Sequence, residues 1–594
     1  MANFALFLVF WALFLLSFTT FGSTKVVEHT FYVQSVIERR LCKDQAITVV
    51  NGSFPGPTIY AEDGDNLIIH VINESPYNMT IHWHGIKQQF SCWADGTGYI
   101  TQCPIRPGNK FTHRFNISGQ EGTLWWHAHT GFHRATVHGA IIIYPRPGRS
   151  YPFPKPDEEV PIILGEWWNE NITELEKQLD VTGWGPNSSD AFLINGYPGD
   201  LYSCSSNDGR RFLKVPQDDQ DSGLQLSSTP EHLKPGTFKL RVTYGKTYLL
   251  RIINSAINPN YFLAIADHKM IVVAADASYT KPYSIDILVL APGQSYDVLL
   301  VANQPPQQYY MATQIHREST AEIPNSLPAS ALIIYENAGN SPPKFPYLPD
   351  MYDTQTSFNF FNGLSGLDTG PFWDPLPLEV DEHMFITVSL GLIDCPTPEK
   401  CPKNNGMLMV TSLNNESFIL PTDKLSFLEA FYHNVDGVYE DDFPSKPPLE
   451  FDYTSSNNGD KECWSKQSTK VKRIKFNSTV EIVFQGTSCG KGENHPLHLH
   501  GYNFYVLGQG LGNYNATKHA SLLNFQNPVV RNTVDVVADG WVVIRFRADN
   551  PGVWFLHCHI EGHVPIGMAT AFIVEDGPTL STTLPPPPLD LPEC

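Results

Sequence analysis

Short stretches of alternating apolar and polar side chains recur along the whole chain. Three of them are Asp65–Asn73 (DNLIIHVIN), Thr247–Asn254 (TYLLRIIN) and Val542–Asn550 (VVIRFRADN), and Pro, Gly and Asn residues separate one stretch from the next. Alternation with a period of two is typical of β-strands, whereas helical periodicity is clear only in Ile172–Gln178. The pattern therefore predicts an all-β protein built from sandwich domains.

A block of sequence that contains one of these strands occurs three times, and a second block follows it each time. The first block covers Gly64–Gly85, Gly245–Asp267 and Ser478–Gly501, and the second begins at Pro107, Pro292 and Asp539. Each copy then closes on an apolar strand: GAIIIYP, SALIIYE or ATAFIVE. Self-similarity of this kind indicates repeated structural units, so we expect three related β-sandwich domains.

Histidines in the pattern His-x-His occur in the first and third copies but not in the second. The eight residues are His82, His84, His127, His129, His498, His500, His557 and His559. Residues i and i+2 of a strand point to the same face, so each pair aims two imidazoles in one direction. One pair alone fits a structural role equally well. Four pairs at equivalent positions predict a cluster of about three metal ions between the first and third domains, with the second domain as a spacer.

The last His-x-His pair has Cys558 at its centre. The cysteine side chain therefore points to the opposite face of the strand and binds a separate metal, a short covalent path from the cluster. Two histidines, one thiolate and a weak axial thioether form a blue-copper site, and the candidates for the other ligands are His495, His563 and Met568. A methionine is more often part of a core, but the spacing of Met568 after Cys558 favours the ligand.

The N-terminal segment indicates the compartment. Phe4–Leu16 is an apolar run of 13 residues that small residues follow. A membrane-spanning helix needs about 20, so residues 1–23 are predicted to be a signal peptide rather than a buried helix. No second run of membrane length follows, and we expect a secreted, extracellular protein without a membrane partner. Nine Asn-x-Ser/Thr sequons agree with export: Asn51, Asn73, Asn78, Asn116, Asn171, Asn187, Asn415, Asn477 and Asn515.

Composition excludes several other classes of protein. The chain has 594 residues with 40 basic and 61 acidic side chains, a net charge of −21, and no basic block, which argues against binding to nucleic acid. Charged residues make up 17% and aromatic residues 12%, which excludes a disordered chain and a coiled coil.

Longer motifs resemble those of the multicopper oxidases, and most closely those of the plant laccases. They include IHWHG, WADG, GQEGTLWWHAH, RATVHGA, NHPLHLHGYNFYVLGQG, RNTVDV and NPGVWFLHCHIEGH, spread over nearly the whole mature chain. The proline-rich segment 341–349 begins an irregular linker that runs to about residue 375 and separates the second domain from the third. The resemblance implies that the three domains, at 24–150, 158–340 and 376–594, are cupredoxin-like (Greek-key). It also implies four copper ions: a type-1 ion in the third domain, and one type-2 and two type-3 ions between the first and third domains.

Each ligand of the family pattern has a counterpart in this chain. By resemblance, the type-1 ligands are His495, Cys558, His563 and Met568; the type-2 ligands are His82 and His498; one type-3 ion has His84, His127 and His559, and the other has His129, His500 and His557. His133 and His138 lie near the second pair, but they break the alternation relative to His129, so we interpret them as structural.

The resemblance implies a monomeric enzyme that makes four one-electron oxidations of p-diphenols or other phenolics, including lignin precursors, and reduces O2 to two waters. Electrons would pass from Cys558 to His557 and His559. The acids that deliver protons in the family correspond to Asp95, in WADG, and Glu561, after HCHI. Both fit equally well a role in which they only orient histidines.

Met568 departs from the laccase pattern, because laccases of this group often have leucine at the axial position and ascorbate oxidases have methionine. The resemblance then implies a low type-1 potential and easily oxidised phenols as substrates, and it leaves ascorbate oxidase as the alternative. The blocks YPFPKPDEEVPIILGEWWN and RATVHGA favour a laccase. A non-catalytic copper-binding wall protein is a further alternative, but such proteins have lost ligands and none is lost here.

Ten cysteines are present, and nine remain once Cys558 is assigned to copper. The expected pairs are Cys42–Cys204 and Cys103–Cys594, both by resemblance, Cys395–Cys401 and Cys463–Cys489. Cys92 is left as a free thiol or a thiol with an unexpected partner.

Overall fold

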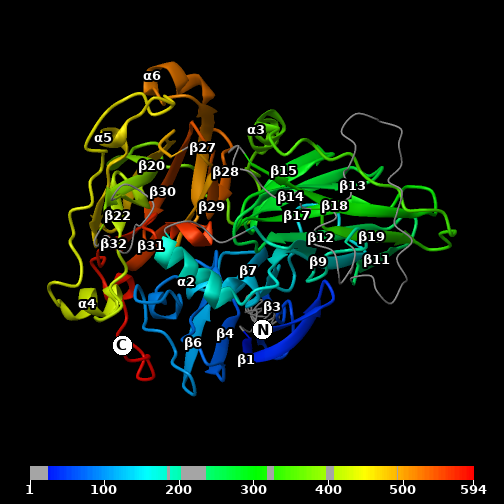
Figure 1. The fold of residues 1–594 in the computed structure, drawn as a ribbon, viewed down its shortest axis with the longest axis horizontal. Coiled ribbons are helices and arrows are strands. Elements are labelled where there is room, and N and C mark those ends of the chain that lie inside the picture. Colours follow the sequence, from blue (N-terminus) through cyan, green and yellow to red (C-terminus); the bar gives the residue numbers. More distant parts are fainter. Residues whose placement is uncertain (1–24, 183–187, 203–235, 318–326, 396–406, 491) are drawn as a thin grey trace, which may run out of the picture.

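The computed structural model describes residues 25–182, 188–202, 236–317, 327–395, 407–490 and 492–594, and these residues form six β-sheets. The sheets lie in three lobes, coloured blue to cyan, green, and yellow to red in chain order (Figure 1). Strands that follow one another along the chain fill one lobe before the next begins. The predicted all-β fold of three sandwich domains is confirmed.

The first domain contains two four-stranded sheets, ordered β2-β1-β4-β6 and β3-β8-β7-β5. Its strands are β1 (Val26–Arg40), β2 (Lys43–Val50), β3 (Ile59–Glu62), β4 (Asn66–Asn73), β5 (Ile81–His84), β6 (Lys110–Asn116), β7 (Gly122–Ala128) and β8 (His138–Tyr144). Along β4 every second side chain is buried, as the alternation predicts. In contrast, β5 and β7 are buried on both faces, so their sheet lies inside the molecule.

The second domain has sheets ordered β10-β9-β12-β17-β14-β15 and β11-β19-β18-β13-β16. Its strands are β9 (Glu158–Trp167), β10 (Ala191–Ile194), β11 (Phe238–Val242), β12 (Thr247–Asn254), β13 (Asn260–Ile265), β14 (Met270–Ala275), β15 (Ser278–Ile285), β16 (Leu288–Leu290), β17 (Ser295–Val301), β18 (Gln308–His316) and β19 (Ser330–Tyr335). The helix expected at Ile172–Gln178 is present as α2 (Ile172–Thr182) and is longer than predicted.

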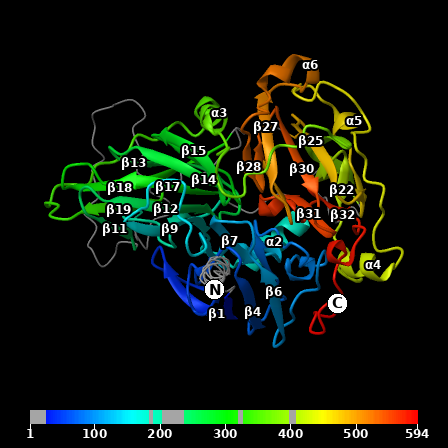
Figure 2. The ribbon, with the colours of Figure 1, turned by 180° about the vertical axis from the view of Figure 1, so that it is seen from behind.

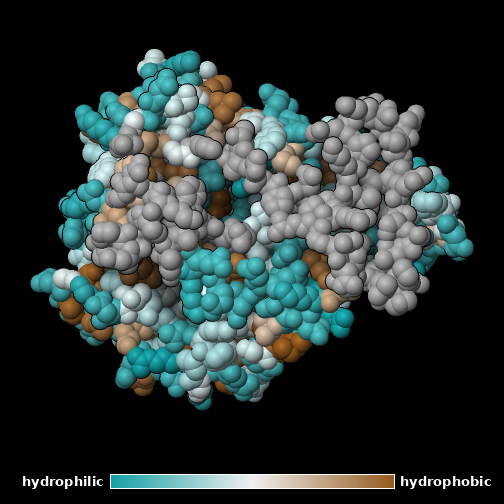
Figure 3. Space-filling model, in the orientation of Figure 1, coloured by the Kyte–Doolittle hydropathy of each residue, from teal (hydrophilic) through white to brown (hydrophobic). Residues whose placement is uncertain are grey.

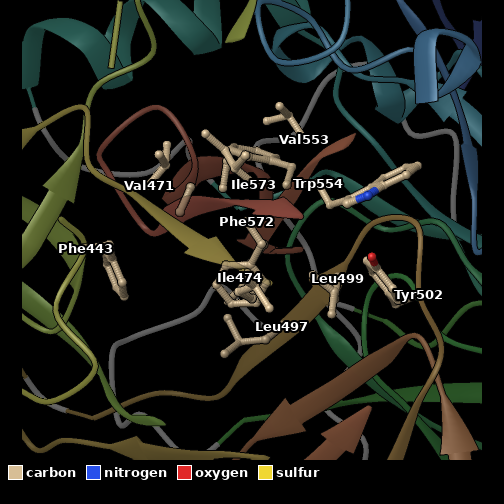
Figure 4. Close-up of a cluster of buried hydrophobic side chains, with 14 of the residues drawn as sticks. Phe443, Val471, Ile474, Leu497, Leu499, Tyr502, Val553, Trp554, Phe572 and Ile573 are labelled. Carbon is tan, nitrogen blue, oxygen red and sulfur yellow. The ribbon is translucent and has the colours of Figure 1, made fainter. Parts of the chain in front are cut away.

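The third domain has sheets ordered β23-β22-β21-β20-β25-β30-β27-β28 and β24-β32-β31-β26-β29. Its strands are β20 (Glu382–Asp394), β21 (Met407–Leu413), β22 (Glu416–Phe418), β23 (Lys466–Ser468), β24 (Val471–Ile474), β25 (Ser478–Gly486), β26 (His495–Leu499), β27 (Phe504–Leu511), β28 (Val529–Arg531), β29 (Thr533–Val536), β30 (Gly540–Ala548), β31 (Gly552–Cys558) and β32 (Ala569–Val574). Figure 4 shows part of its core, where Leu497, Trp554 and Phe572 from β26, β31 and β32 meet.

The linker expected to be irregular at 341–375 contains a helix, α3 (Thr354–Gly363). The carboxylate of Asp353 caps its first turn by accepting a hydrogen bond from the backbone N–H of Thr356. Phe360 packs into the core of the second domain, with its ring 5.6 Å from that of Tyr296. The helix therefore forms because local capping and an apolar anchor act together, which the proline-rich start of the linker conceals. Shorter helices are α4 (Phe427–His433), α5 (Asp460–Cys463) and α6 (Ala516–His519).

Two of the predicted disulfides are confirmed, Cys103–Cys594 and Cys463–Cys489. The first ties the C-terminal segment to the first domain, and the red end of the chain lies beside the blue strands in both views (Figures 1 and 2). Cys42 and Cys395 are disulfide-bonded, and their expected partners, Cys204 and Cys401, lie outside the described residues. Among the described residues, Cys92 and Cys558 have free thiols, as expected.

The coloured residues on the face drawn in Figure 3 are mostly hydrophilic, with hydrophobic residues in separate small groups. The described part of the chain has no helix that is long and apolar enough to cross a membrane. One sequon is not on the surface: Asn73 is fully buried, and its side-chain amide donates to the carbonyls of Tyr77 (2.7 Å) and Ile105 (2.8 Å). This asparagine therefore serves the fold of the first domain.

Candidate metal centre

Four short strands carry the His-x-His pairs, two in each of the inner sheets. In the first domain, His82 on β5 lies directly opposite His127 on β7. In the third domain, His498 on β26 lies opposite His557 on β31. Each strand ends at or next to the second histidine of its pair. Side chains two residues apart then share one face, as the sequence pattern requires.

The eight histidines of these pairs come together between the first and third domains. Three groups have ring nitrogens that all lie within 4.8 Å of one another: His82, His84 and His498; His84, His127 and His559; and His129, His500 and His557. Two rings of the first domain stack on rings of the third, His84 on His498 with centroids 3.8 Å apart and His82 on His500 at 4.0 Å. The predicted sets therefore lie together, and each contains histidines from both domains.

Hydrogen bonds outside the cluster fix which ring nitrogen is free. The Nδ1 atoms of His82, His127, His498 and His557 each lie 2.8 Å from a backbone carbonyl, those of Asp95, Ala128, Asn532 and Cys558 respectively. A carbonyl only accepts, so each Nδ1 carries the proton and each Nε2 presents a lone pair. The Nε2 atoms of His82, His127 and His498 are buried without any partner. Buried lone pairs that converge in this way fit a bound cation.

The protonation of the cluster agrees with a set of neutral ligands. Burial, reinforced by the neighbouring imidazoles, lowers the pKa of His84, His127, His498, His500, His557 and His559 well below the usual value, and that of His129 to about 3. Neutral imidazole is a ligand for Cu, Zn, Fe and Ni ions. The donor set therefore fits a cluster of late first-row transition metals.

A second group of candidate ligands lies entirely within the third domain and includes His495, Cys558 and His563. The Sγ atom of Cys558 is 3.4 Å from Nδ1 of His563 and 3.9 Å from Nδ1 of His495. Met568 is fully buried. Its backbone lies beside these residues, because its N–H donates to the carbonyl of His563 (2.9 Å) and its carbonyl accepts from the N–H of Cys558 (3.1 Å). Two imidazoles, a thiolate and a nearby thioether match the composition of a blue-copper site.

Asp95 lies beside the cluster and contacts two of its histidines. Its carboxylate accepts from Nδ1 of His500 (2.9 Å) and from the hydroxyl of Thr97 (2.7 Å), and its backbone carbonyl accepts from His82. Burial opposes ionisation, but His500 and His82 hold the pKa of the Asp95 carboxyl well below its usual value. Asp95 is therefore a carboxylate placed to orient two rings.

Glu561 lies next to a buried arginine, Arg134, which contacts His559 of the cluster. Its carboxylate accepts from Nη1 of Arg134 at 2.7 Å, and burial raises the pKa of the Glu561 carboxyl in spite of that charge. Arg134 also donates from Nη2 to the carbonyl of His559 (2.8 Å) and to that of Ala256 in the second domain (3.0 Å). One guanidinium therefore contacts all three domains.

Four residues of this region have no role in the sequence interpretation. The side-chain oxygens of Asn532 and Thr533 each lie 3.1 Å from Nε2 of His84. Arg134 donates a hydrogen bond to the carbonyl of His559. The carboxylate of Glu493 lies 3.2 Å from Nε2 of His563. Three of them stand in the motifs RNTVDV and RATVHGA, which are visible in the sequence. A motif match alone does not say which ring a side chain touches.

The geometry agrees with comparisons to known proteins. Multicopper oxidase family signatures match residues 33–148, 158–338 and 442–578, one in each sandwich domain. The chain is 49% identical to Laccase-7 of Arabidopsis thaliana over 592 residues, 98% of both proteins. It is 47% identical to Laccase-24 of Oryza sativa subsp. japonica over 607 residues, 98% of this chain and 99% of that protein.

A solved structure extends the comparison to three dimensions. The crystal structure of a laccase from Botrytis aclada has 25% sequence identity to this chain and a TM-score of 0.69, covering 95% of this chain and 89% of that one. The three sandwiches are thus cupredoxin-like domains, and the family implies copper as the metal. The chain belongs to the multicopper oxidase family, among the plant laccases, and is an oxidoreductase.

Proposed function

We propose that this protein is a secreted laccase that couples four one-electron oxidations of phenolic substrates to the reduction of O2 to two waters. The observation that carries the proposal is that the tripeptide His557-Cys558-His559 joins two proposed ligand sets. Cys558 belongs to the set of the third domain, while His557 and His559, its neighbours in the chain, belong to the sets between the domains. Identity to curated laccases over nearly the full length supports the same activity.

The ligand sets divide naturally among four copper ions. His495, Cys558, His563 and Met568 would hold the type-1 ion, and His82 and His498 the type-2 ion; His84, His127 and His559 would hold one type-3 ion, and His129, His500 and His557 the other. Bound copper would supply a one-electron acceptor for the substrate at the first site and, at the cluster, the electrons that reduce O2.

The phenolic substrate would give up its electron near His563. This residue is the most exposed member of its set, at 9%, whereas His495 is 2% exposed and both Cys558 and Met568 are fully buried. Its ring faces the carboxylate of Glu493, which is 28% exposed and therefore reaches the surface. Cys558 then provides the connection, because only the peptide backbone separates its side chain from the imidazoles on either side.

Glu561 and Asp95 would divide the handling of protons. Burial raises the pKa of Glu561, which favours a carboxyl that can hold a proton and release it toward the cluster. Asp95 is ionised and its carboxylate already accepts two hydrogen bonds, so its part is to hold the rings of His500 and His82 in their orientation in the cluster. Arg134 holds Glu561 in place and fixes its distance from the ligands.

Ascorbate oxidation is the second candidate, since a methionine at position 568 is typical of ascorbate oxidases. The net charge of −21 favours neutral phenols over an acidic substrate, because like charges slow their association. Lignin precursors are phenols of this kind. The N-terminal apolar run and the sequons support export into the extracellular space.

Oxygen uptake with a panel of substrates tests the proposal. Copper-loaded enzyme should show a blue thiolate-to-copper absorbance and consume O2 faster with p-diphenols and monolignols than with ascorbate or ferrous iron. Faster uptake with ascorbate would replace the laccase assignment by ascorbate oxidase. Absence of both colour and uptake after copper loading would contradict any oxidase function.

A further inference from the structure

A loop of the second domain reaches the histidine cluster, although that domain contains none of the proposed copper ligands. The loop precedes β17 and includes Gly293 and Gln294, both buried. A side-chain carbon added at Gly293 would lie 3.0 Å from ring atoms of His559 and 3.2 Å from Cε1 of His84. Real Cβ contacts are rarely this short, so the backbone of the second domain lies directly against two imidazoles.

The conformation at Gly293 brings the backbone this close. Its φ angle is +92°, in the region that favours glycine. The N–H of Gly293 donates to the carbonyl of Asn254 (2.9 Å), and its own carbonyl accepts from the indole of Trp125 in the first domain (3.2 Å). The residue is thus held on both sides and cannot move away from the rings without losing hydrogen bonds.

Gln294 extends the contact to the third domain. Its side-chain oxygen accepts from the N–H of Ala291 (3.0 Å), and its side-chain N–H donates to the carbonyl of Thr533 (3.1 Å). The hydroxyl of Thr533 lies 3.1 Å from Nε2 of His84 and 3.1 Å from Nδ1 of His498. The loop therefore acts on His84 twice, through packing at Gly293 and through the position of Thr533.

The same domain holds the backbone on which Thr533 lies. Asp276, 1% exposed, accepts from the N–H groups of Asn532 (3.2 Å) and Thr533 (3.3 Å), and it is paired with Arg531 at 3.1 Å. A second segment of this domain supplies the Ile257 carbonyl, which accepts from the N–H of Glu561 (3.1 Å). Contacts from the second domain thus flank the cluster on two sides.

We propose that the second domain is a positioning part of the metal centre, and that Gly293 sets the separation of His84 and His559, which come from different domains and are two of the three proposed ligands of one type-3 ion. The inference rests on the proposed copper ligands. It replaces the role of spacer that the missing His-x-His pairs suggest for this domain. Gly293 and Gln294 are positioning residues, since neither offers a ligand atom to the metal.

The test is the variant Gly293→Ala with Gly245→Ala as its matched control. Gly245 belongs to the same domain and has a similar φ of +87°, but a Cβ there would meet no atom within 4 Å. The two variants therefore impose the same backbone cost, and only Gly293→Ala pushes on imidazoles. Copper titration of the copper-free proteins, followed by copper content and by the blue absorbance, separates the cluster from the type-1 site.

For Gly293→Ala we expect an affinity for the cluster copper about 10-fold below that of the wild type, at the lower end of the effects seen when residues that orient ligands are changed. The blue absorbance should persist, because His495, Cys558 and His563 lie in another set. Gly245→Ala should titrate like the wild type. If Gly293→Ala and Gly245→Ala bind the cluster copper with the same affinity, and the wild type binds copper normally, the inference is overturned and the proposed function stays intact.

Wild-type protein that binds no copper would overturn the proposed function, and the inference with it. Should Gly293→Ala not give folded protein by circular dichroism, Gln294→Met decides, since it keeps the length of the side chain and removes only its hydrogen bonds to Ala291 and Thr533. Weaker binding of the cluster copper with unchanged blue absorbance supports the positioning role, and wild-type binding contradicts it.

Discussion

The variant Arg531→Met should destabilise the interface between the second and third domains strongly. Arg531 and Asp276 are 2% and 1% exposed, and their side chains form two hydrogen bonds of 3.1 Å across this interface. The same guanidinium donates to the hydroxyl of Tyr296 at 2.6 Å. Methionine fills a similar volume but leaves the Asp276 carboxylate buried without a cation.

Breaking a buried ion pair by removing one partner costs about 3–5 kcal/mol. Asp276 still accepts from the backbone N–H groups of Ser295, Asn532 and Thr533 in this variant, so we expect the lower end, about 3 kcal/mol. For a cooperative unit of roughly 150–250 residues, each kcal/mol lowers Tm by about 2–4 °C, which gives a decrease of about 6–12 °C.

Differential scanning calorimetry of the copper-free protein measures this loss without any contribution from metal binding. A chain of three domains need not unfold in one step, so the comparison applies to the transition that the variant shifts. The control is Lys269→Met, which removes an ion pair with Asp286 whose side chains are 66% and 70% exposed, and whose loss should leave Tm nearly unchanged. A decrease in Tm for Arg531→Met no larger than that of the control would show that the pair of Arg531 and Asp276 does not stabilise this interface.

Three further predictions concern single residues. Burial raises the pKa of Glu166 from 4.5 to about 7, so between these pH values the folded protein holds a proton that the unfolded chain has lost. The free energy of unfolding therefore falls by about 1.4 kcal/mol for each pH unit in this range. Glu166→Gln should remove this fall, so the Tm of the variant relative to the wild type increases from pH 5 to pH 8; a constant difference would contradict the assignment. Met568→Leu should raise the type-1 potential in a redox titration, and an unchanged or lower potential would show that the thioether does not act on the site. Glycopeptide mass spectrometry should find Asn73 without a glycan, because its amide is buried and hydrogen-bonded, whereas Asn78 is exposed and accessible; a glycan on Asn73 would show that this part of the first domain is folded differently.

The strands and the grouping of the histidines could be predicted from the sequence, because both follow from the geometry of a β-strand. Alternation along a strand is local, so the faces of β4 and of the His-x-His pairs follow from spacing alone. The position of Cys558 between two histidines likewise places its side chain in another site, as its 3.4 Å contact with His563 illustrates. The internal repeat adds the pairing of the first domain with the third.

The residues around the ligands could not be predicted in the same way. Arg134 meets Glu561, and Gly293 meets His84 and His559, only because three domains are packed together. No spacing rule connects positions so far apart in the chain. The absence of His-x-His pairs from the second copy of the repeat even favours the role of spacer for that domain, although its backbone lies against His84 and His559. Similarly, α3 depends on Phe360 finding the core of the second domain.

The ratio of substrate oxidised to O2 consumed distinguishes a four-electron oxidase from an oxidase that releases hydrogen peroxide. Substrate oxidised and O2 consumed are measured together, with hydrogen peroxide determined in the same sample, in copper-loaded enzyme supplied with a p-diphenol. The joined ligand sets predict four one-electron oxidations for each O2 and no accumulation of peroxide. Two oxidations for each O2, with peroxide formed in equal amount, would contradict the account.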